Sequence, residues 1–197
     1  MSVKSSDFRK EGIPIVKASN IKNKTIININ SFISFDNQRD EFERVKLKNG
    51  DIIISTVGSK PEVVASAVGQ LASINSKFSG SYLNQNTMCI RPVSDVNANF
   101  LKYAFFSKYT RSKFDAASLW IANQAYLEVE NIRNIEFSFP LPSEQTAIVN
   151  HIETEITRID VKIAKTKKII GLQKEYRTAL ISEVVTGKVK IPQETKL

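Results

Sequence analysis

Amide, hydroxyl and cationic side chains gather in segments of this chain that read as loops between short strands. An amide can donate and accept hydrogen bonds at one edge, which matches adenine in the major groove, and Lys or Arg matches guanine or phosphate. Loops on a rigid scaffold are also where binding residues concentrate. We therefore predict a DNA-reading surface made of Lys17, Asn20, Lys22, Ser59, Lys60, Asn84, Gln85, Asn86, Asn123 and Gln124. The alternative for each residue taken singly is ordinary turn chemistry.

The sequence lacks the side-chain sets that catalysis would need. The one histidine, His151, is far in sequence from any plausible nucleophile, which argues against the usual hydrolase triads. There is no glycine-rich phosphate loop, and no Asn- or Asp-Pro-Pro-aromatic run of the kind that holds a flipped adenine in methyltransferases. Four carboxylates could ligate a metal but lack a matching lysine or second acid: Asp51, Glu62, Glu128 and Glu130. We expect no catalysis, and no metal or cofactor bound by this chain.

Charge and composition favour a polyanionic partner. The 197 residues are 42% hydrophobic, enough for a real core, and carry a formal net charge of +8. Residues 1–24 hold six basic side chains against two acidic ones, so much of the excess lies near the front of the chain. A solvated basic surface with no partner is the alternative.

Cysteine usage and hydropathy argue against a disulfide-bonded, zinc-binding or membrane protein. The one cysteine, Cys89, excludes an internal disulfide and a multi-cysteine zinc site, and we expect it to point into a core. No apolar run approaches the roughly 18 residues of a membrane span, and no secretory segment opens the chain. We expect a soluble, cytoplasmic protein without membrane contact.

Residues 1–140 predict a mixed α+β domain rich in short strands. Runs of β-branched residues predict strands at 13–17, 25–29, 52–56, 87–91 and 135–139, and a hairpin about Gly69 that joins 62–68 to 70–74. Residues 36–43 predict a surface helix or loop, and residues 97–117 predict one or two helices with buried aromatic side chains. We expect residues 118–126 to form a loop or turn, with Trp120 buried in the core or, alternatively, stacked on a base.

The last third of the chain predicts a long helix. Pro142 cannot continue a preceding helix, Ser143 can cap a new one, and Gly187 is expected to end it. Apolar residues at spacings of three and four form one stripe: Ile148, Ile152, Ile156, Ile159, Ile163, Ile170 and Leu180. About 40 helical residues span roughly 60 Å, too long for one small domain to cover. Residues 141–190 therefore predict a spacer helix, followed by a tail at 191–197.

The charges of this helix favour pairing with a second helix. Its early turns are acidic (Glu144, Glu153, Glu155) and its later turns basic (Lys165, Lys168). Two antiparallel copies would place unlike charges opposite each other, whereas parallel copies would oppose like charges. We expect an antiparallel coiled coil and a homodimer. The alternative is a helix that folds back onto its own domain.

Short motifs along the chain carry a resemblance to a known family. The helix holds Pro142-Ser143-Glu144-Gln145, Ile159-Asp160, Tyr176-Arg177-Thr178-Ala179-Leu180-Ile181 and Val185-Thr186-Gly187-Lys188-Val189. Upstream are Gly12-Ile13-Pro14, Asn20-Ile21, Gly50-Asp51-Ile52-Ile53-Ile54-Ser55, Val57-Gly58, Asn86 and Arg91-Pro92. In their order and spacing, these pieces resemble the specificity subunits of type I restriction–modification systems.

The resemblance implies a role and partners. Such subunits pair two recognition domains through antiparallel helices and read a bipartite site in double-stranded DNA, so one domain plus one helix is one half. Modification and restriction subunits would supply methyl transfer with S-adenosylmethionine, and cleavage with ATP and Mg²⁺. Family members also place a strand and turn before the Gly-Ile-Pro segment, and residues 1–11 look too short for both. The runner-up is a stand-alone DNA-binding regulator that dimerises through the helix, and the third possibility is an enzyme with an unrecognised site.

Overall fold

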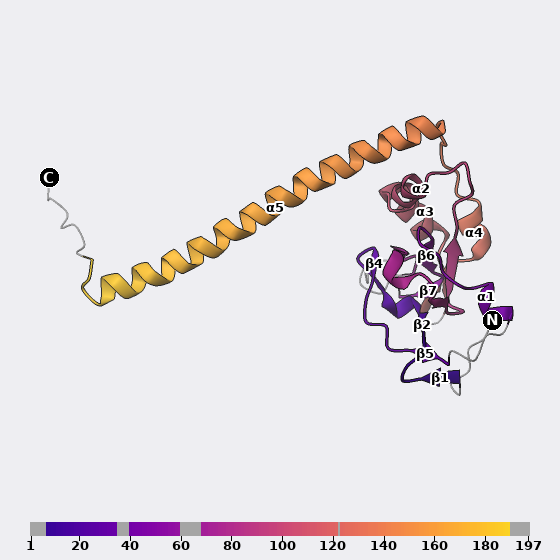
Figure 1. Cartoon of the computed structure of the whole chain (residues 1–197), viewed down its shortest axis with the longest axis horizontal. Coiled ribbons are helices and arrows are strands. Elements are labelled where there is room, and N and C mark those ends of the chain that lie inside the picture. Colours follow the sequence, from indigo (N-terminus) through magenta and orange to yellow (C-terminus); the bar gives the residue numbers. More distant parts are fainter. Residues whose placement is uncertain (1–6, 35–39, 60–67, 122, 190–197) are drawn as a thin grey trace. The chain divides into compact units, whose positions relative to one another are not determined.

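The computed structural model describes residues 7–34, 40–59, 68–121 and 123–189, which fall into two compact units, Met1–Val149 and Asn150–Leu197 (Figure 1). The strands are β1 Phe8–Arg9, β2 Ile13–Val16, β3 Ile21–Lys22, β4 Thr25–Ile26, β5 Phe32–Ile33, β6 Ile52–Ser55, β7 Val57–Gly58, β8 Leu71–Ser73, β9 Tyr82–Leu83, β10 Thr87–Ile90, β11 Leu119–Ile121 and β12 Gln124–Tyr126. The helices are α1 Asp40–Glu43, α2 Ala98–Phe105, α3 Lys108–Ala117, α4 Val129–Arg133 and α5 Pro142–Val185. The mixed strands followed by one long helix confirm the predicted α+β class.

Small sheets, rather than one large one, build the globular unit. Among the described residues, β1, β5, β2 and β9 form a mixed sheet in that order, in which β2 and β9 run parallel. Strands β10, β6 and β8 form an antiparallel sheet, as do β11, β12 and β7, and β3 pairs with β4. The parallel pair puts the carboxyl ends of β2 and β9 side by side. The loops that follow these two strands, 17–20 and 84–86, are therefore neighbours.

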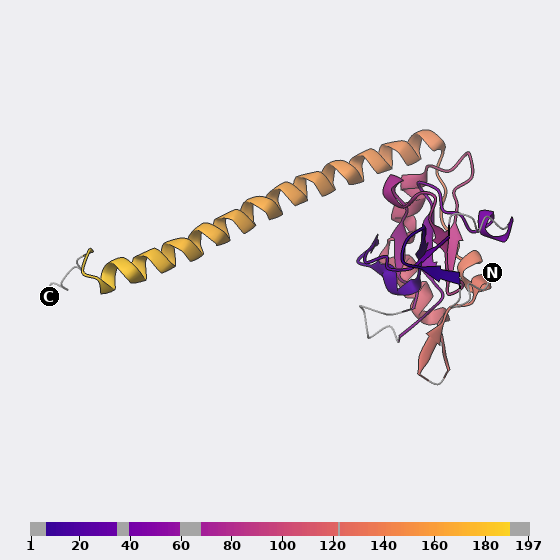
Figure 2. The ribbon, with the colours of Figure 1, turned by 60° about the horizontal axis from the view of Figure 1, so that its bottom comes forward.

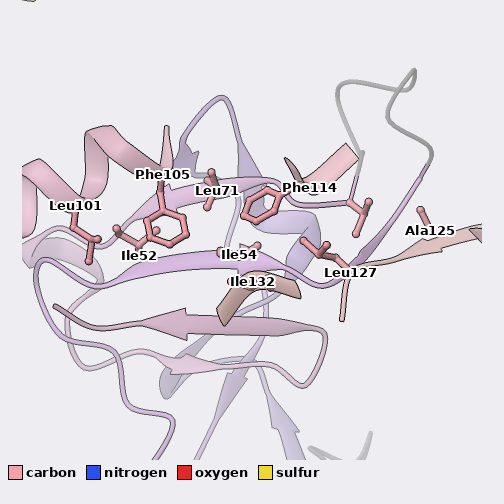
Figure 3. Close-up of a cluster of buried hydrophobic side chains, with 10 residues drawn as sticks. Ile52, Ile54, Leu71, Leu101, Phe105, Phe114, Ala125, Leu127 and Ile132 are labelled. Carbon is pink, nitrogen blue, oxygen red and sulfur yellow. The ribbon is translucent and has the colours of Figure 1, made fainter. Parts of the chain in front are cut away.

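Strand β6 lies at the centre of the core. Ile52 and Ile54 belong to one hydrophobic cluster, with Phe105 and Phe114 from α2 and α3, whereas Ile53 belongs to a second cluster on the opposite face. Figure 3 shows the first cluster with its side chains converging on β6. A strand buried on both faces reads as a continuous apolar run, which is why the sequence predicted it.

Several predicted elements have different bounds or a different structure. Of the one or two helices predicted at 97–117, the structure has two, α2 and α3, because Ser107 interrupts them and caps α3 by accepting a hydrogen bond from the Thr110 amide. The strand predicted at 135–139 is not a strand. Its Phe137 and Phe139 instead pack their rings against other aromatic side chains, such as Phe105 at 4.9 Å between the centroids of Phe105 and Phe137.

Other differences lie nearer the front of the domain. Only residues 25 and 26 of the predicted strand 25–29 pair, and residues 118–126 form a hairpin instead of a loop. The proposed strand at 62–68 lies almost wholly outside the described residues. A strand precedes the Gly-Ile-Pro segment after all, because β1 pairs with β5. Gly12 sits between β1 and β2 at φ 139°, where a Cβ would come within 1.9 Å of the Ile33 carbonyl oxygen, so only glycine fits.

Two of the sequence motifs meet in one ion pair, between the buried carboxylate of Asp51 and the partly exposed Arg91. Arg91 donates from Nε and Nη2 to the two carboxylate oxygens of Asp51 at 2.8 and 2.7 Å, and the Lys48 amide donates to Asp51 Oδ2 at 2.7 Å. Burial alone would raise the pKa of Asp51, but these hydrogen bonds outweigh it and hold the pKa below its ordinary value. Burial and the Asp51 charge raise the pKa of the neighbouring Cys89 thiol to about 12. Cys89 is therefore a protonated side chain that packs against the second cluster.

The first turns of α5 belong to the globular unit. Gln145 is 2% exposed, its Oε1 accepts from the Asn97 amide at 2.8 Å, and its Nε2 donates to the Pro140 carbonyl at 2.9 Å. Val149, one turn later, is also buried. Helix α5 begins where the prolines predicted, while the packing boundary lies at Val149. At its other end, Gly187 takes φ 72° and the Lys188 amide donates to the Glu183 carbonyl, as expected of a glycine that ends a helix.

Replacing Asp51 by Asn should destabilise the globular unit by about 1–3 kcal/mol at neutral pH, because it removes a buried carboxylate that accepts three hydrogen bonds. A carboxyl group whose pKa is lowered on folding stabilises the fold above its unfolded pKa of about 3.9, and that contribution is lost as the pH falls through the folded value. The gap between wild type and Asp51→Asn in urea unfolding should therefore shrink below about pH 4. A gap of the same size at pH 3 and pH 7 would contradict this assignment.

Candidate nucleic-acid interface

The topology brings several predicted loops to one end of the globular unit. Loop 17–20 follows β2 and turn 84–86 follows β9, and the Asn84 amide donates to the Val16 carbonyl at 3.0 Å. The Asn86 carbonyl in turn accepts from the Thr56 amide at 3.0 Å, between β6 and β7. Strand β7 then pairs with β12 of the hairpin. Segments that lie more than a hundred residues apart in the sequence, such as loop 17–20 and β12, therefore meet at the same end.

A cavity of about 400 Å³ opens at this end. Its polar lining includes hydroxyl, amide and cationic groups, from Ser19, Lys22, Ser59, Gln70, Asn123 and Gln124. No Asp or Glu is among the described residues that line it. The site is thus suited to a negatively charged ligand that makes hydrogen bonds. Four predicted residues are gathered here (Lys22, Ser59, Asn123 and Gln124), whereas Lys60 lies outside the described residues.

Asn20 has a structural task instead of a place at this surface. It is 5% exposed, and its Oδ1 accepts from the Lys17 amide at 2.9 Å. Its Nδ2 donates to the carbonyls of Ile27 and Asn28 at 3.1 and 2.9 Å. These bonds use its amide to tie loop 17–20 to the segment after β4. We therefore remove Asn20 from the candidate DNA-contact residues. The sequence alone does not show that this side chain is buried.

The other predicted residues surround the cavity without lining it. Lys17 is half-buried, and its Nζ lies 4.4 Å from the centroid of the Phe8 ring. Asn84 shapes its own turn by accepting a hydrogen bond from the Asn86 amide at 3.2 Å, whereas Gln85 and Asn86 are exposed. Exposed amides in this turn keep Gln85 and Asn86 as candidates, while Asn84 acts through the turn.

The hairpin β11–β12 was not predicted as an element, although Asn123 and Gln124 within it were predicted as site residues. It extends from the body of the unit as a two-stranded ribbon (Figure 2). Trp120, expected in the core, is 44% exposed, and Ile121 is 60% exposed. Tyr126 was also missed, although its Oη donates to Gln124 Oε1 at 2.8 Å. A spacing of two residues on a strand, which puts side chains on one face, was the available signal.

The described residues do not meet the requirements of a metal site or of a membrane-spanning helix. No three His, Cys, Asp or Glu side chains among them gather closely enough to hold a metal ion. No described helix is both long and apolar enough to cross a bilayer. His151 is exposed on α5, and Glu130 lies 3.8 Å from Arg133 on the same short helix.

Helix α5 presents its predicted stripe to solvent. Ile148 and Ile152 are half-buried, whereas Ile156, Ile159, Ile163, Ile170 and Leu180 are 42%, 48%, 46%, 50% and 40% exposed. Of all 44 residues of the helix, only Gln145 and Val149 are buried. The second unit therefore contains no described element that covers the stripe.

Comparison with known proteins identifies the family. Residues 1–170 match the model of the type I restriction modification DNA specificity domain, and the chain belongs to this family. It is 25% identical over 187 residues to the specificity subunit of the type I restriction enzyme EcoKI from Escherichia coli K12, covering 92% of this chain and 38% of the relative.

Solved structures share the fold. The HsdS subunit from Thermoanaerobacter tengcongensis matches 97% of this chain and 48% of its own, with a TM-score of 0.62 and 15% identity. A chain from a study of complex assembly and conformational transition of the type I R-M system matches 92% of this chain and 41% of its own, with a TM-score of 0.64 and 15% identity. The chain thus spans less than half the length of these relatives.

Replacing Asn20 by Ala should cost about 1–3 kcal/mol of unfolding free energy, because it leaves the Lys17 amide and two carbonyls without their partner. The matched change Asn123→Ala, at an exposed amide in the hairpin turn, should stay within about 0.5 kcal/mol of wild type. Urea unfolding followed by circular dichroism measures both. Equal stability of the two variants would mean that the assignment of Asn20 to the loop is wrong.

Proposed function

We propose that this chain is a DNA-recognition half of a type I restriction–modification specificity subunit. Its globular unit reads one half of a bipartite site in double-stranded DNA, and its helix joins it to a second such half. It carries out no chemistry of its own. The observation that carries this proposal is the cavity at one end of the unit, where Lys22, Ser59, Asn123 and Gln124 meet without a carboxylate in the described lining.

The side chains of this site suit base recognition better than catalysis. Asn and Gln can each make two hydrogen bonds to adenine, a serine hydroxyl can donate to or accept from a base edge, and lysine can contact guanine or a phosphate. Asp51 is the most deeply buried carboxylate among the described residues. Its charge is neutralised by Arg91, so it is not available as a catalytic acid or base. Membership of the DNA specificity family agrees with this reading.

Partner subunits would supply the reactions and cofactors. We propose that modification subunits bring S-adenosylmethionine, and that restriction subunits, when present, bring ATP and Mg²⁺. No cofactor is assigned to this chain. The alternative of a stand-alone regulator is not favoured, because the family match extends over residues 1–170 and so includes both the domain and much of α5.

The second half would be another copy of this chain, paired antiparallel through α5. Val149, Ile152, Ile156, Ile159 and Ile163 alternate spacings of three and four, which is the heptad spacing of a coiled coil. Val149 is buried in the globular unit, and the exposure of Ile156, Ile159 and Ile163 leaves a seam that a second helix can bury. The acidic start and basic end of the helix favour the antiparallel direction.

Selection of duplexes from a random library, by the chain together with its modification subunits, tests the recognition proposal. We expect enrichment of a defined motif. Lys22→Ala should weaken binding to all duplexes alike and lower the salt slope by about 1, whereas Asn123→Ala/Gln124→Ala should reduce discrimination by about 1–3 kcal/mol per lost base contact. The absence of any enriched motif would refute the proposal. Equal selectivity and affinity of the chain alone would favour the regulator.

Light scattering tests the pairing. The wild-type chain should show twice its mass of 22.1 kDa at tens of micromolar. The double change Ile156→Asp/Ile163→Asp should yield single protomers, because each replacement would bury an unpaired carboxylate in the seam. The control Val161→Asp/Leu172→Asp adds the same charges to exposed positions off the stripe and should leave the dimer intact. A wild-type mass of one protomer would rule out the homodimer.

A further inference from the structure

The hairpin β11–β12 has one face that its own domain does not cover. Its register pairs Leu119 with Tyr126, Trp120 with Ala125 and Ile121 with Gln124, and cross-strand partners share a face. Ala125 is 1% exposed and belongs to the first core cluster, so this face packs on the domain at Ala125, while its partner Trp120 on β11 is 44% exposed. The opposite face carries Leu119, Ile121, Gln124 and Tyr126.

This outward face combines an aliphatic surface with one oriented amide. Ile121 is 60% exposed and lies directly across from Gln124, at a cross-strand separation of about 5 Å between Cβ atoms. Tyr126 Oη donates to Gln124 Oε1 at 2.8 Å, and Tyr126 is held by the pairing of β12 with Val57 of β7. Among the described residues, none accepts a hydrogen bond from Gln124 Nε2, so the amide keeps its two N–H donors and one acceptor lone pair for a ligand.

That combination matches an A·T pair seen from the major groove. A glutamine amide accepts from the adenine N6 amino group and donates to N7, while an apolar side chain contacts the thymine 5-methyl group. A two-stranded ribbon also has the width that the major groove admits. The neighbouring cavity, lined by Gln124 and Lys22 without a described carboxylate, complements the negative charge of the DNA backbone.

We propose that the ribbon β11–β12 enters the major groove, where Gln124, positioned by Tyr126, reads an adenine and Ile121 packs on the 5-methyl group of a thymine in the same base step. This inference rests on the proposed function and adds the base pair and the residues that select it. Ile121 is a specificity residue by shape, and Tyr126 is a positioning residue that acts through Gln124.

Modified duplexes test this pairing directly. The full chain with its modification subunits is first given its selected duplex, in which thymines are then replaced singly by deoxyuridine and adenines singly by 7-deazaadenine. Loss of the one contacted methyl group should weaken wild-type binding about three- to fivefold. Loss of the contacted N7 should weaken it by about five- to fiftyfold. Neither effect should occur at more than one recognised step of each half-site.

Variants then assign each effect to its residue. Ile121→Ala should bind the natural duplex less well and become insensitive to the deoxyuridine, as coupled partners do in a double-mutant cycle. Gln124→Ala should lose the 7-deazaadenine effect, and Tyr126→Phe should reduce it while the fold stays intact. Val93→Ala, which trims an exposed aliphatic side chain outside the ribbon, should retain both effects.

The outcomes separate this inference from the proposed function. If a motif is selected but no single deoxyuridine weakens binding, or if Ile121→Ala stays sensitive to it, the inference is overturned and DNA recognition stands. If Ile121→Ala loses the modification subunits while its DNA response is unchanged, the face binds protein and the inference is likewise overturned. If no motif is selected, both fail. The deoxyuridine scan of the wild-type protein needs no variant, so a variant that misfolds leaves the test in place.

Discussion

The burial of strand β6 on both faces is the constraint on which the rest of the globular unit depends. Ile52 and Ile54 pack on one side and Ile53 on the other, so polar groups are confined to the ends of the strand. At one end Asp51 is neutralised by Arg91. At the other, Ser55 Oγ accepts from the Gln70 amide at 2.9 Å, at the edge of the cavity. The core thus ends where the candidate interface begins.

The residues that stabilise the fold differ from the candidate contact residues. The buried side chains come from the strands of several sheets and from helices α1 to α4, whereas most candidate contact residues sit on loops and on a hairpin that buries little besides Ala125. Changes to Asn123, Gln124 or Ile121 therefore cost the core little. Residues on such loops can be substituted while the scaffold is retained. The solved relatives share the fold of this chain at 15% sequence identity, which is consistent with a conserved scaffold and variable loops.

Helix α5 is likewise divided into a part that packs on the globular unit and a part that is exposed. Gln145 and Val149 fasten its first turns into the globular unit, and the rest of the helix exposes an apolar stripe that offers a surface for a partner. An apolar stripe of this length is poorly explained as a surface of an isolated chain, because water contact with so many isoleucines is unfavourable. Pairing through the helix would also fix the separation of two recognition units.

The sequence predicted those features that depend on local pattern. The continuous isoleucine run of β6, the proline-bounded start of α5 and Gly187 at its end are each fixed by side chains within a few residues. Burial, and contacts between residues far apart in the sequence, could not be predicted from such local patterns. Asn20 looks like any loop amide until the carbonyls of Ile27 and Asn28 surround it. Trp120 was expected in the core because large aromatic residues usually lie there, yet its strand β11 lies at the edge of a sheet and Trp120 is 44% exposed.

The most direct test of this account is sequencing of methylated sites in cells that express this chain with its modification subunits. Two copies related by a twofold axis should present identical recognition units to the two halves of the site. We therefore predict a bipartite motif whose half-sites are identical and inverted, separated by a gap of fixed length. An asymmetric motif, a gap of variable length, or methylation without any shared motif would contradict the account.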